Sequence, residues 1–221
     1  MKRSEINAAI IRAKKLLADN HITLPFFGYA SPEELRGYDI SRIKATMLGW
    51  DVTDFGSDDF AHVGATLFTV RNGDVKHPGV GTPYAEKYII LKSGEGQEIP
   101  MHYHENKTED IINRAGGQLM IQVYNSTPDK QLDTETPVEL WLDGVKHSFK
   151  PGEVICVTTG NSVTLTPYVF HRFYAEGGDV VIGEVSSIND DNTDNVFLAP
   201  SERFIGIDED EAPTHLLCNE Y

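Results

Sequence analysis

The sequence predicts an all-β protein, a sandwich or a barrel, preceded by short helices. From about Thr66 to about Ile188 the chain consists of short β-branched and aromatic runs that are broken by Gly, Pro, Asn and Asp. Asp143-Gly144 separates two alternating runs, which is a strong hairpin signal, and Pro151-Gly152 marks the next turn. Many short strands at regular spacing are typical of sandwiches and barrels.

Two helices are predicted ahead of the strands. Ser4 can cap the first, which ends near Asn20 and repeats apolar residues at helical spacing. The second begins at Ser31, where Pro32 takes the first helical position and Glu34 completes a capping box. We expect this second helix to be short.

The strongest strand candidates then follow in this order: Tyr88 to Lys92, Gln118 to Tyr124, Val138 to Leu142, Val154 to Thr158, Ser162 to Thr166, Phe170 to Tyr174 and Val180 to Val185. The tail is acidic, but Phe and Leu residues are interspersed in it, so we expect it to pack back on the strands. We predict a single domain over residues 1–221, with a helical extension at 1–45, the strands at 46–188 and the acidic segment at 189–221.

Composition and charge restrict the partners. The 221 residues include 34 Asp and Glu against 19 Lys and Arg, a formal net charge of −15. This acidity, without any Lys/Arg-rich run, argues against nucleic acid or an anionic membrane as the main partner. The charged N-terminus lacks the apolar region of a signal peptide, no window is apolar enough to span a bilayer, and Cys156 and Cys218 form no CxxC pair. We therefore expect a cytoplasmic protein with a small or neutral substrate.

The chemically informative stretch extends from Gly96 to Gly116. His102 and His104 are two residues apart, so on an extended strand both imidazoles point to the same face. Glu109 follows after a polar turn, and a following strand could return its carboxylate to the same place. Two imidazoles and a carboxylate on strands form a candidate metal site. The alternative is ordinary surface or core histidines, because patterns this short are common.

In full, the stretch is G-x5-H-x-H-x4-E-x6-G, which resembles the first conserved motif of the cupin superfamily. The resemblance implies a cupin double-stranded β-helix, a jelly-roll-like barrel that holds one metal ion inside. A second cupin motif supplies a further histidine, and Pro167 to His171 is the candidate, although it lacks the glycine usual between Pro and His. The alternatives are weaker: His147 lies beside Lys146 on a hairpin strand, and the other histidines lie in loops or termini.

Segments outside this motif resemble the bacterial D-lyxose isomerase family. They are spread over essentially the whole chain, at residues 1–7, 44–56, 183–195 and 203–221. In that family a Mn²⁺-dependent cupin interconverts D-lyxose and D-xylulose, often with D-mannose and D-fructose as secondary substrates. The resemblance implies four metal ligands, His102, His104, Glu109 and His171. A set without a thiolate suits Mn²⁺ and other borderline divalent ions.

Moving a hydrogen between C1 and C2 of a sugar requires a base for the C2 proton and a cation that stabilises the enediolate. A metal-assisted hydride shift is the alternative route. Glu184 is our preferred acid/base group, because a charge within the otherwise apolar strand 180–185 is costly unless it faces a polar cavity. We expect Glu109 to act as a catalytic group as well as a metal ligand. An edge-strand surface position is the alternative for Glu184.

Three further residues are weaker candidates. Lys92 alternates in phase with Tyr88 and Ile90, so it could face the barrel interior and orient the sugar or transfer protons, or lie in solvent at the strand end. Asp190 could contribute to a lid over the site. Arg203 could bind a substrate hydroxyl or simply pair with the acidic segment.

The sequence favours a free sugar as substrate, because no Gly-rich phosphate loop precedes a helix. Two other functions stay open. A cupin metal oxygenase would need Fe²⁺ and an apolar or aromatic pocket, and a non-catalytic sugar-binding cupin would usually carry a DNA-binding or partner module. We expect a homodimer, because exposed barrel edges and an apolar tail can form a symmetric contact.

Overall fold

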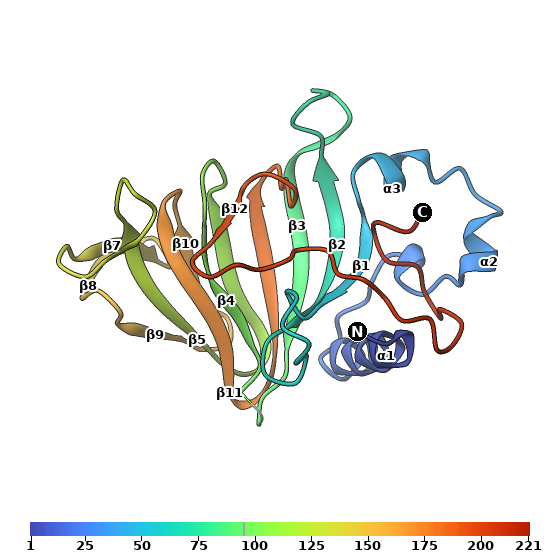
Figure 1. Ribbon diagram of the computed structural model, residues 1–221, viewed down its shortest axis with the longest axis horizontal. Coiled ribbons are helices and arrows are strands. Elements are labelled where there is room, and N and C mark those ends of the chain that lie inside the picture. The colour runs from blue at the N-terminus through green and yellow to red at the C-terminus, as the bar shows by residue number, and fades with distance from the viewer. Residues whose placement is uncertain (95) are drawn as a thin grey trace.

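The structure is a computed structural model that describes residues 1–94 and 96–221 (Figure 1). The helical elements come first: α1 (Arg3–Asp19), the 3₁₀ turn η1 (Phe26–Gly28), α2 (Pro32–Leu35) and α3 (Ser41–Ala45). The strands are β1 (Gly49–Thr53), β2 (Ala65–Gly73), β3 (Gly81–Leu91), β4 (Glu98–His104), β5 (Glu109–Ser126), β6 (Leu132–Asp133), β7 (Val138–Leu142), β8 (Val145–Phe149), β9 (Val154–Val157), β10 (Ser162–Leu165), β11 (Val169–Ser187) and β12 (Asn195–Phe197). The prediction of an all-β cupin barrel with N-terminal helices is confirmed. None of the helices in the described residues is long and apolar enough to cross a membrane.

The strands form one sheet whose main path runs β1-β2-β3-β11-β5-β10-β7-β8. The two longest strands, β5 and β11, pair with each other along most of their length and take different second partners at each end: β11 pairs β4 and then β3, and β5 pairs β10 and then β9. The two strands that the sequence predicts at 170–174 and 180–185 are therefore one strand. It bends at Gly177-Gly178, where the register with β5 shifts and both residues have positive φ.

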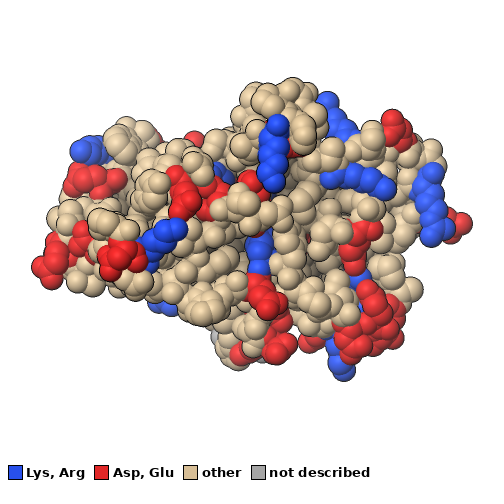
Figure 2. All heavy atoms as spheres, turned by 45° about the horizontal axis from the view of Figure 1, so that its top comes forward, with Lys and Arg blue, Asp and Glu red and all other residues tan. Residues whose placement is uncertain are grey.

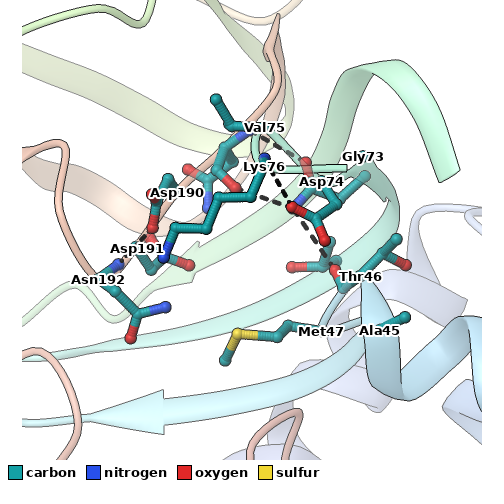
Figure 3. Close-up of a pocket in the computed structure, with 13 residues that line it drawn as sticks. Ala45, Thr46, Met47, Gly73, Asp74, Val75, Lys76, Asp190, Asp191 and Asn192 are labelled. Carbon is teal, nitrogen blue, oxygen red and sulfur yellow. Dashed lines mark hydrogen bonds between the residues drawn. The ribbon is translucent and has the colours of Figure 1, made fainter. Parts of the chain in front are cut away.

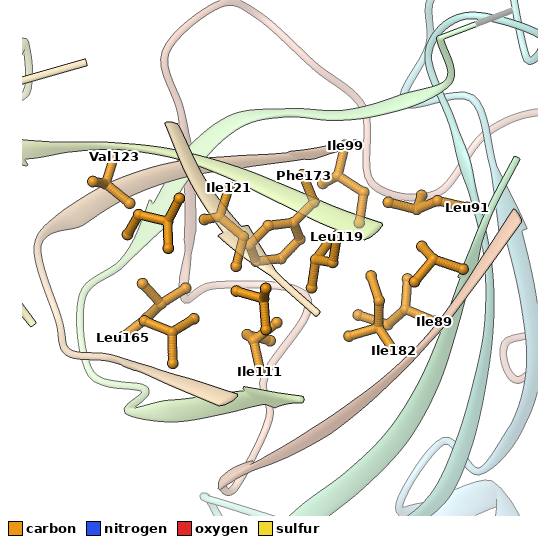
Figure 4. Packing of buried hydrophobic residues seen from close by; sticks show 14 of the residues in the cluster. Ile89, Leu91, Ile99, Ile111, Leu119, Ile121, Val123, Leu165, Phe173 and Ile182 are labelled. Carbon is orange, nitrogen blue, oxygen red and sulfur yellow. The ribbon is translucent and has the colours of Figure 1, made fainter. Parts of the chain in front are cut away.

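Apolar residues form two separate cores on the two faces of this sheet. The first fills the barrel interior and includes Ile111 and Leu119 of β5 and Ile182 of β11 (Figure 4). The second lies between α1 and the outer face of β1 to β3, with Ile10 and Phe68 fully buried in it. The alternation of side chains along each strand thus decides which core a residue joins.

The local turn signals in the sequence are largely correct. Ser31 and Glu34 make both hydrogen bonds of the predicted capping box at the start of α2. Asp143 and Gly144 both have positive φ in the turn between β7 and β8, as a two-residue hairpin requires. The first helix differs from the prediction, because it begins at Arg3 and the Ser4 side chain donates to Asp210 instead of capping it.

The C-terminal segment packs back on the barrel, as predicted. β12 pairs with β4, and Leu217 forms a bridge with Trp50. Arg3, which is buried in α1, pairs with Glu209 and Glu220. In Figure 1 this segment runs across the front of the barrel from β12 to the helices.

Candidate metal centre and active site

Three histidines from two paired strands converge inside the barrel. His102 and His104 are two residues apart on β4, so their side chains share one face of the strand. β11 runs antiparallel to β4 and places His171 opposite His102. All three residues are buried, and one ring nitrogen of each lies within 4.8 Å of the others. Such a group could hold a metal ion.

The carboxylate of Glu109, at the start of β5, faces the same point. Its Oε1 atom lies 3.5 Å from Nε2 of His104 and 3.3 Å from Nε2 of His171. That oxygen is buried and accepts no hydrogen bond from the described residues. A buried carboxylate oxygen without a donor or a cation beside it is energetically costly.

Hydrogen bonds on the far side of two rings fix their tautomers. Nδ1 of His102 donates to the Pro100 carbonyl at 2.8 Å, and Nδ1 of His171 donates to the Val169 carbonyl at 2.9 Å. Because a carbonyl only accepts, the Nε2 atom of each neutral ring carries a lone pair. These two Nε2 atoms are 3.1 Å apart. Two nitrogen lone pairs and a carboxylate oxygen without a hydrogen-bond donor repel one another at this point, and a cation between them would turn that repulsion into attraction. The residues therefore fit a metal ion.

The protonation states also suit a metal. Burial, and then the neighbouring rings of His171 and His104, hold the pKa of His102 well below its ordinary value. Burial and the ammonium group of Lys107 lower the pKa of His104. Burial alone would raise the pKa of Glu109, but Lys107 and His104 hold it well below its ordinary range. Neutral imidazoles and an ionised carboxylate are the ligating forms.

A series of buried charges leads away from Glu109. Lys107 Nζ lies 2.7 Å from Glu109 Oε2 and 3.0 Å from Glu184 Oε1. Lys87, on β3, lies 4.0 Å from the same oxygen of Glu184 and 3.6 Å from Asp191 Oδ2. The signs alternate along this series, so each ammonium group is shared between two carboxylates. Because Lys87, Lys107, Glu109 and Glu184 are buried, the loss of one would leave its neighbours uncompensated.

Arg203 fixes the far end of the series. Its Nη1 atom lies 2.5 Å from Asp51 Oδ2, and its Nη2 atom lies 3.2 Å from Asp191 Oδ2. Burial alone would raise the pKa of Asp191, but Arg203 and Lys87 hold it far below its ordinary value. Arg203 therefore ties the segment after β11 to β1, at the edge of the site.

Most of these groups line a cavity of about 40 Å³, which we call the metal cavity: His102, His104, Lys107, Glu109, Glu184, Lys87, Asp191 and Arg203. Apart from Asn195, the rest of its wall is apolar and consists of Leu67, Ile89, Phe55, Ile99, Phe173 and Phe197. The segment after β11 covers the cavity, because Asp191, Asn195, Phe197 and Arg203 all contribute to its lining. Walls that exclude water strengthen the electrostatic interactions inside.

The structure brings together six residues expected from the sequence: His102, His104, Glu109, His171, Glu184 and Arg203. Lys92 is not among them. The side chains that face the barrel interior on β3 are Lys87, Ile89 and Leu91, whereas Ile90 belongs to the core under α1. Lys92 shares the phase of Ile90 and lines a different cavity beside α1. The expectation that Lys92 faces the site is corrected, because the opposite face of β3 is the interior one.

Asp190 also lies outside the metal cavity. Its carboxylate accepts hydrogen bonds from the Asn192 amide and the Thr193 hydroxyl, which stabilise a turn after β11. The next residue, Asp191, lines the metal cavity instead. A turn gives no regular alternation from which to choose between the two.

Sequence reasoning missed Lys107, Lys87, Asp191 and Asp51. A signal existed for Lys87, which is in phase with the apolar Ile89 and therefore lies on a buried face. Lys107 belongs to the apparently polar turn of the motif, and its burial depends on contacts with β11 that no local pattern reveals. Asp191 is one of several acidic residues in a row, and composition alone does not distinguish them.

Comparisons with known proteins identify the family. A family model described as D-lyxose isomerase matches residues 1–221. The chain belongs to the D-lyxose isomerase family. Two relatives named D-lyxose/D-mannose isomerase, from Serratia proteamaculans and Escherichia coli O157:H7, are 43% and 40% identical over 228 residues, and each match covers 100% of this chain and 98% of the relative. This member of the D-lyxose isomerase family is thus an enzyme, a sugar aldose-ketose isomerase.

Solved structures share the fold of this isomerase. An L-ribose isomerase of Cellulomonas parahominis with L-ribose aligns with a TM-score of 0.59 at 15% identity, over 94% of this chain and 98% of that one. The L-ribose isomerase of Geodermatophilus obscurus aligns with a TM-score of 0.58 at 16% identity, over 91% of this chain and 94% of that one. At such identities the likeness concerns the fold alone.

Proposed function

We propose that this isomerase interconverts D-lyxose and D-xylulose, and also D-mannose and D-fructose, with a divalent metal ion. The names of the two relatives support this choice of sugars. The observation that carries the proposal is the convergence of three imidazoles and one carboxylate beside a cavity that Glu184 also lines.

We propose His102, His104, Glu109 and His171 as the metal ligands and Mn²⁺ as the metal. Three nitrogens and one oxygen with no thiolate suit a borderline divalent ion, and the family resemblance favours manganese. When bound, the ion would stabilise negative charge on two neighbouring sugar oxygens, at C1 and C2.

Glu184 is the proposed acid/base group. Its Oε1 atom accepts hydrogen bonds from Lys107 at 3.0 Å and from the Ser186 hydroxyl at 3.1 Å, which hold the carboxylate in place. In this orientation Glu184 would take the proton from C2 of the aldose and return it to C1 of the ketose. The presence of a carboxylate in the cavity favours proton transfer over a hydride shift. Lys107 would keep Glu184 and Glu109 at a fixed separation during the transfer.

A free, neutral sugar is the proposed substrate class. The cations that line the metal cavity, Lys87, Lys107 and Arg203, each pair with a buried carboxylate, so none is available to a phosphate group. The surface is consistent with this choice: Figure 2 shows patches of Asp and Glu on the visible face, with Lys and Arg mostly scattered. A sugar phosphate or a nucleic acid would be repelled.

We also propose a cytoplasmic homodimer. Cys156 and Cys218 are both free thiols, which suits a reducing compartment. The edge strand β8 and the exposed Trp141 and Val145 of the β7–β8 hairpin offer a surface for a symmetric contact. Sedimentation analysis would test this assembly by giving the mass of a dimer or of a single chain.

Metal add-back tests the proposed function. Protein stripped of metal is incubated with D-lyxose while Mn²⁺ is titrated, and D-xylulose is measured. We expect turnover to rise until one ion is bound per chain. His104→Ala should stay inactive at every Mn²⁺ concentration, whereas His147→Ala, at an exposed position on β8, should match the wild type. Full turnover in metal-stripped protein would refute metal dependence.

A further inference from the structure

A second and larger pocket lies against the metal cavity. We call it the outer pocket; it has a volume of about 200 Å³ and opens between the β2–β3 hairpin, the end of α3 and the segment after β11. Its lining includes Thr69, Asn72, Lys76, Asn189, Asp191 and Asn192. Figure 3 shows the Lys76 side chain extended across this pocket toward Asp191 and Asn192.

The two spaces share a wall. Asp191 lines both of them. Asn189 lines the outer pocket, and its Oδ1 atom accepts a hydrogen bond at 3.3 Å from Lys107, which lines the metal cavity. Thr69 of the outer pocket pairs in register with Lys87 of the metal cavity. The outer pocket therefore lies directly beside the metal cavity along the inner face of β2 and β3, with Asp191 at the boundary.

The metal cavity is too small for a whole sugar. Its volume of about 40 Å³ is room for only a few water molecules, at roughly 10–15 Å³ for each on the same measure. An ion and the C1–C2 end of a substrate would fill it. The rest of an open-chain pentose or hexose must lie in an adjoining space.

The outer pocket has the chemistry that hydroxyl groups need. Thr69 is only 5% exposed, and its hydroxyl makes no hydrogen bond within residues 1–94 and 96–221, although it borders the pocket. Leu67, on the same face of β2 two residues earlier, lines the metal cavity. Two residues along a strand span roughly 7 Å, which is comparable to the length of a sugar chain. Because Thr69 lines the pocket, a ligand there can form a hydrogen bond with this hydroxyl.

We propose that the outer pocket binds the far end of the open-chain sugar, from C4 outward, with Thr69 as one hydrogen-bonding partner. This inference rests on the proposed function, whose chemistry places C1 and C2 at the metal. Carboxylates in the pocket accept hydrogen bonds from hydroxyl groups, side-chain amides both accept and donate, and Lys76 at the rim donates. The outer pocket thereby determines which sugar chain lengths bind. Binding of D-mannose, which is one carbon longer than D-lyxose, depends more strongly on this pocket.

Thr69→Val tests the assignment, because valine keeps the shape of threonine and removes the hydroxyl. The matched control is Thr66→Val, a buried threonine on the opposite face of β2. With Mn²⁺-loaded protein, we expect Thr69→Val to raise KM for D-mannose about two- to tenfold, the effect of one lost hydrogen bond, with a smaller change for D-lyxose and a smaller change in kcat. Calorimetry with D-mannitol, an open-chain analogue that cannot isomerise, should show a similar loss of affinity.

The assignment would be overturned if Thr69→Val and Thr66→Val had the same KM for both sugars and the same affinity for D-mannitol. A fall in kcat alone, equal for both sugars, would also overturn it. If Thr69→Val fails to fold, Asn192→Ala at the exposed rim tests the same pocket and should change KM in the same direction. A wild-type protein that isomerises neither sugar refutes the proposed function, whereas normal wild-type turnover with unaffected variants refutes only the outer pocket.

Discussion

Replacement of Lys107 by Met is expected to destabilise the metal-free protein strongly. The Lys107 ammonium group lies 2.7 Å from Glu109 and 3.0 Å from Glu184, and all three side chains are at most 4% exposed. Methionine fills a similar volume but leaves two buried carboxylates without their shared cation. Removing one partner of a buried ion pair costs about 3–5 kcal/mol. For a chain of this size that corresponds to a fall in Tm of roughly 6–20 °C.

The assay is urea unfolding of metal-free protein, followed by circular dichroism and fluorescence. Lys146→Met is the matched control, because Lys146 pairs with Glu139 at 3.1 Å while their side chains are 57% and 47% exposed. An exposed pair contributes about 0–1 kcal/mol, so this variant should unfold close to the wild type. If Lys107→Met and Lys146→Met lose the same small free energy of unfolding, the argument from burial is wrong.

A second substitution sharpens the test. Adding Glu184→Gln to Lys107→Met removes one of the two uncompensated charges, so the double variant should be more stable than the sum of the two single losses predicts. Strict additivity would mean that Lys107 and Glu184 do not interact energetically, despite their distance of 3.0 Å.

Three further predictions follow from the site. His104→Ala should fold but retain no stoichiometric Mn²⁺ after desalting, because one of four ligands is lost; metal analysis that finds a full complement would exclude His104 as a ligand. Glu184→Gln should bind Mn²⁺ normally and lose about 10²–10⁴-fold in kcat, the usual contribution of a general base, so near-normal turnover would remove it from that role. Because Arg203 and Lys87 hold the pKa of Asp191 far below its ordinary value despite its burial, this group stabilises the folded state above about pH 4 and loses that contribution as the pH falls further. Asp191→Asn should therefore flatten the acid dependence of the free energy of unfolding, and an unchanged slope would contradict the assignment.

Local patterns explain why much of the fold is predictable from the sequence. The capping box of Ser31 and the Asp143-Gly144 turn depend only on neighbouring residues, and both are found where they were expected. The helix start at Ser4 was wrong because Asp210, far along the chain, binds its side chain. The merging of two predicted strands into β11 likewise depends on pairing with β5, which no local window contains.

In the candidate site, too, local patterns predict some residues, whereas others depend on contacts between distant segments. His102, His104 and Glu109 follow from the spacing of one motif, and Glu184 follows from a charge in an apolar strand. The choice between Lys87 and Lys92 required knowledge of which face of β3 is the barrel interior, and β3 is apolar on both faces because α1 covers the outer one. Lys107 and Asp191 were missed because their positions in the site result from contacts between distant segments.

The central claim is that a metal held by these histidines and Glu109 drives isomerisation by proton transfer at Glu184. The most direct test incubates metal-stripped protein with D-lyxose in D₂O, with and without Mn²⁺, and measures both D-xylulose and its deuterium content. The account predicts D-xylulose only with Mn²⁺ and solvent deuterium at C1 of the product. Deuterium-free product would contradict an exchanging proton transfer, and no ketose from D-lyxose or D-mannose under either condition would contradict the account as a whole.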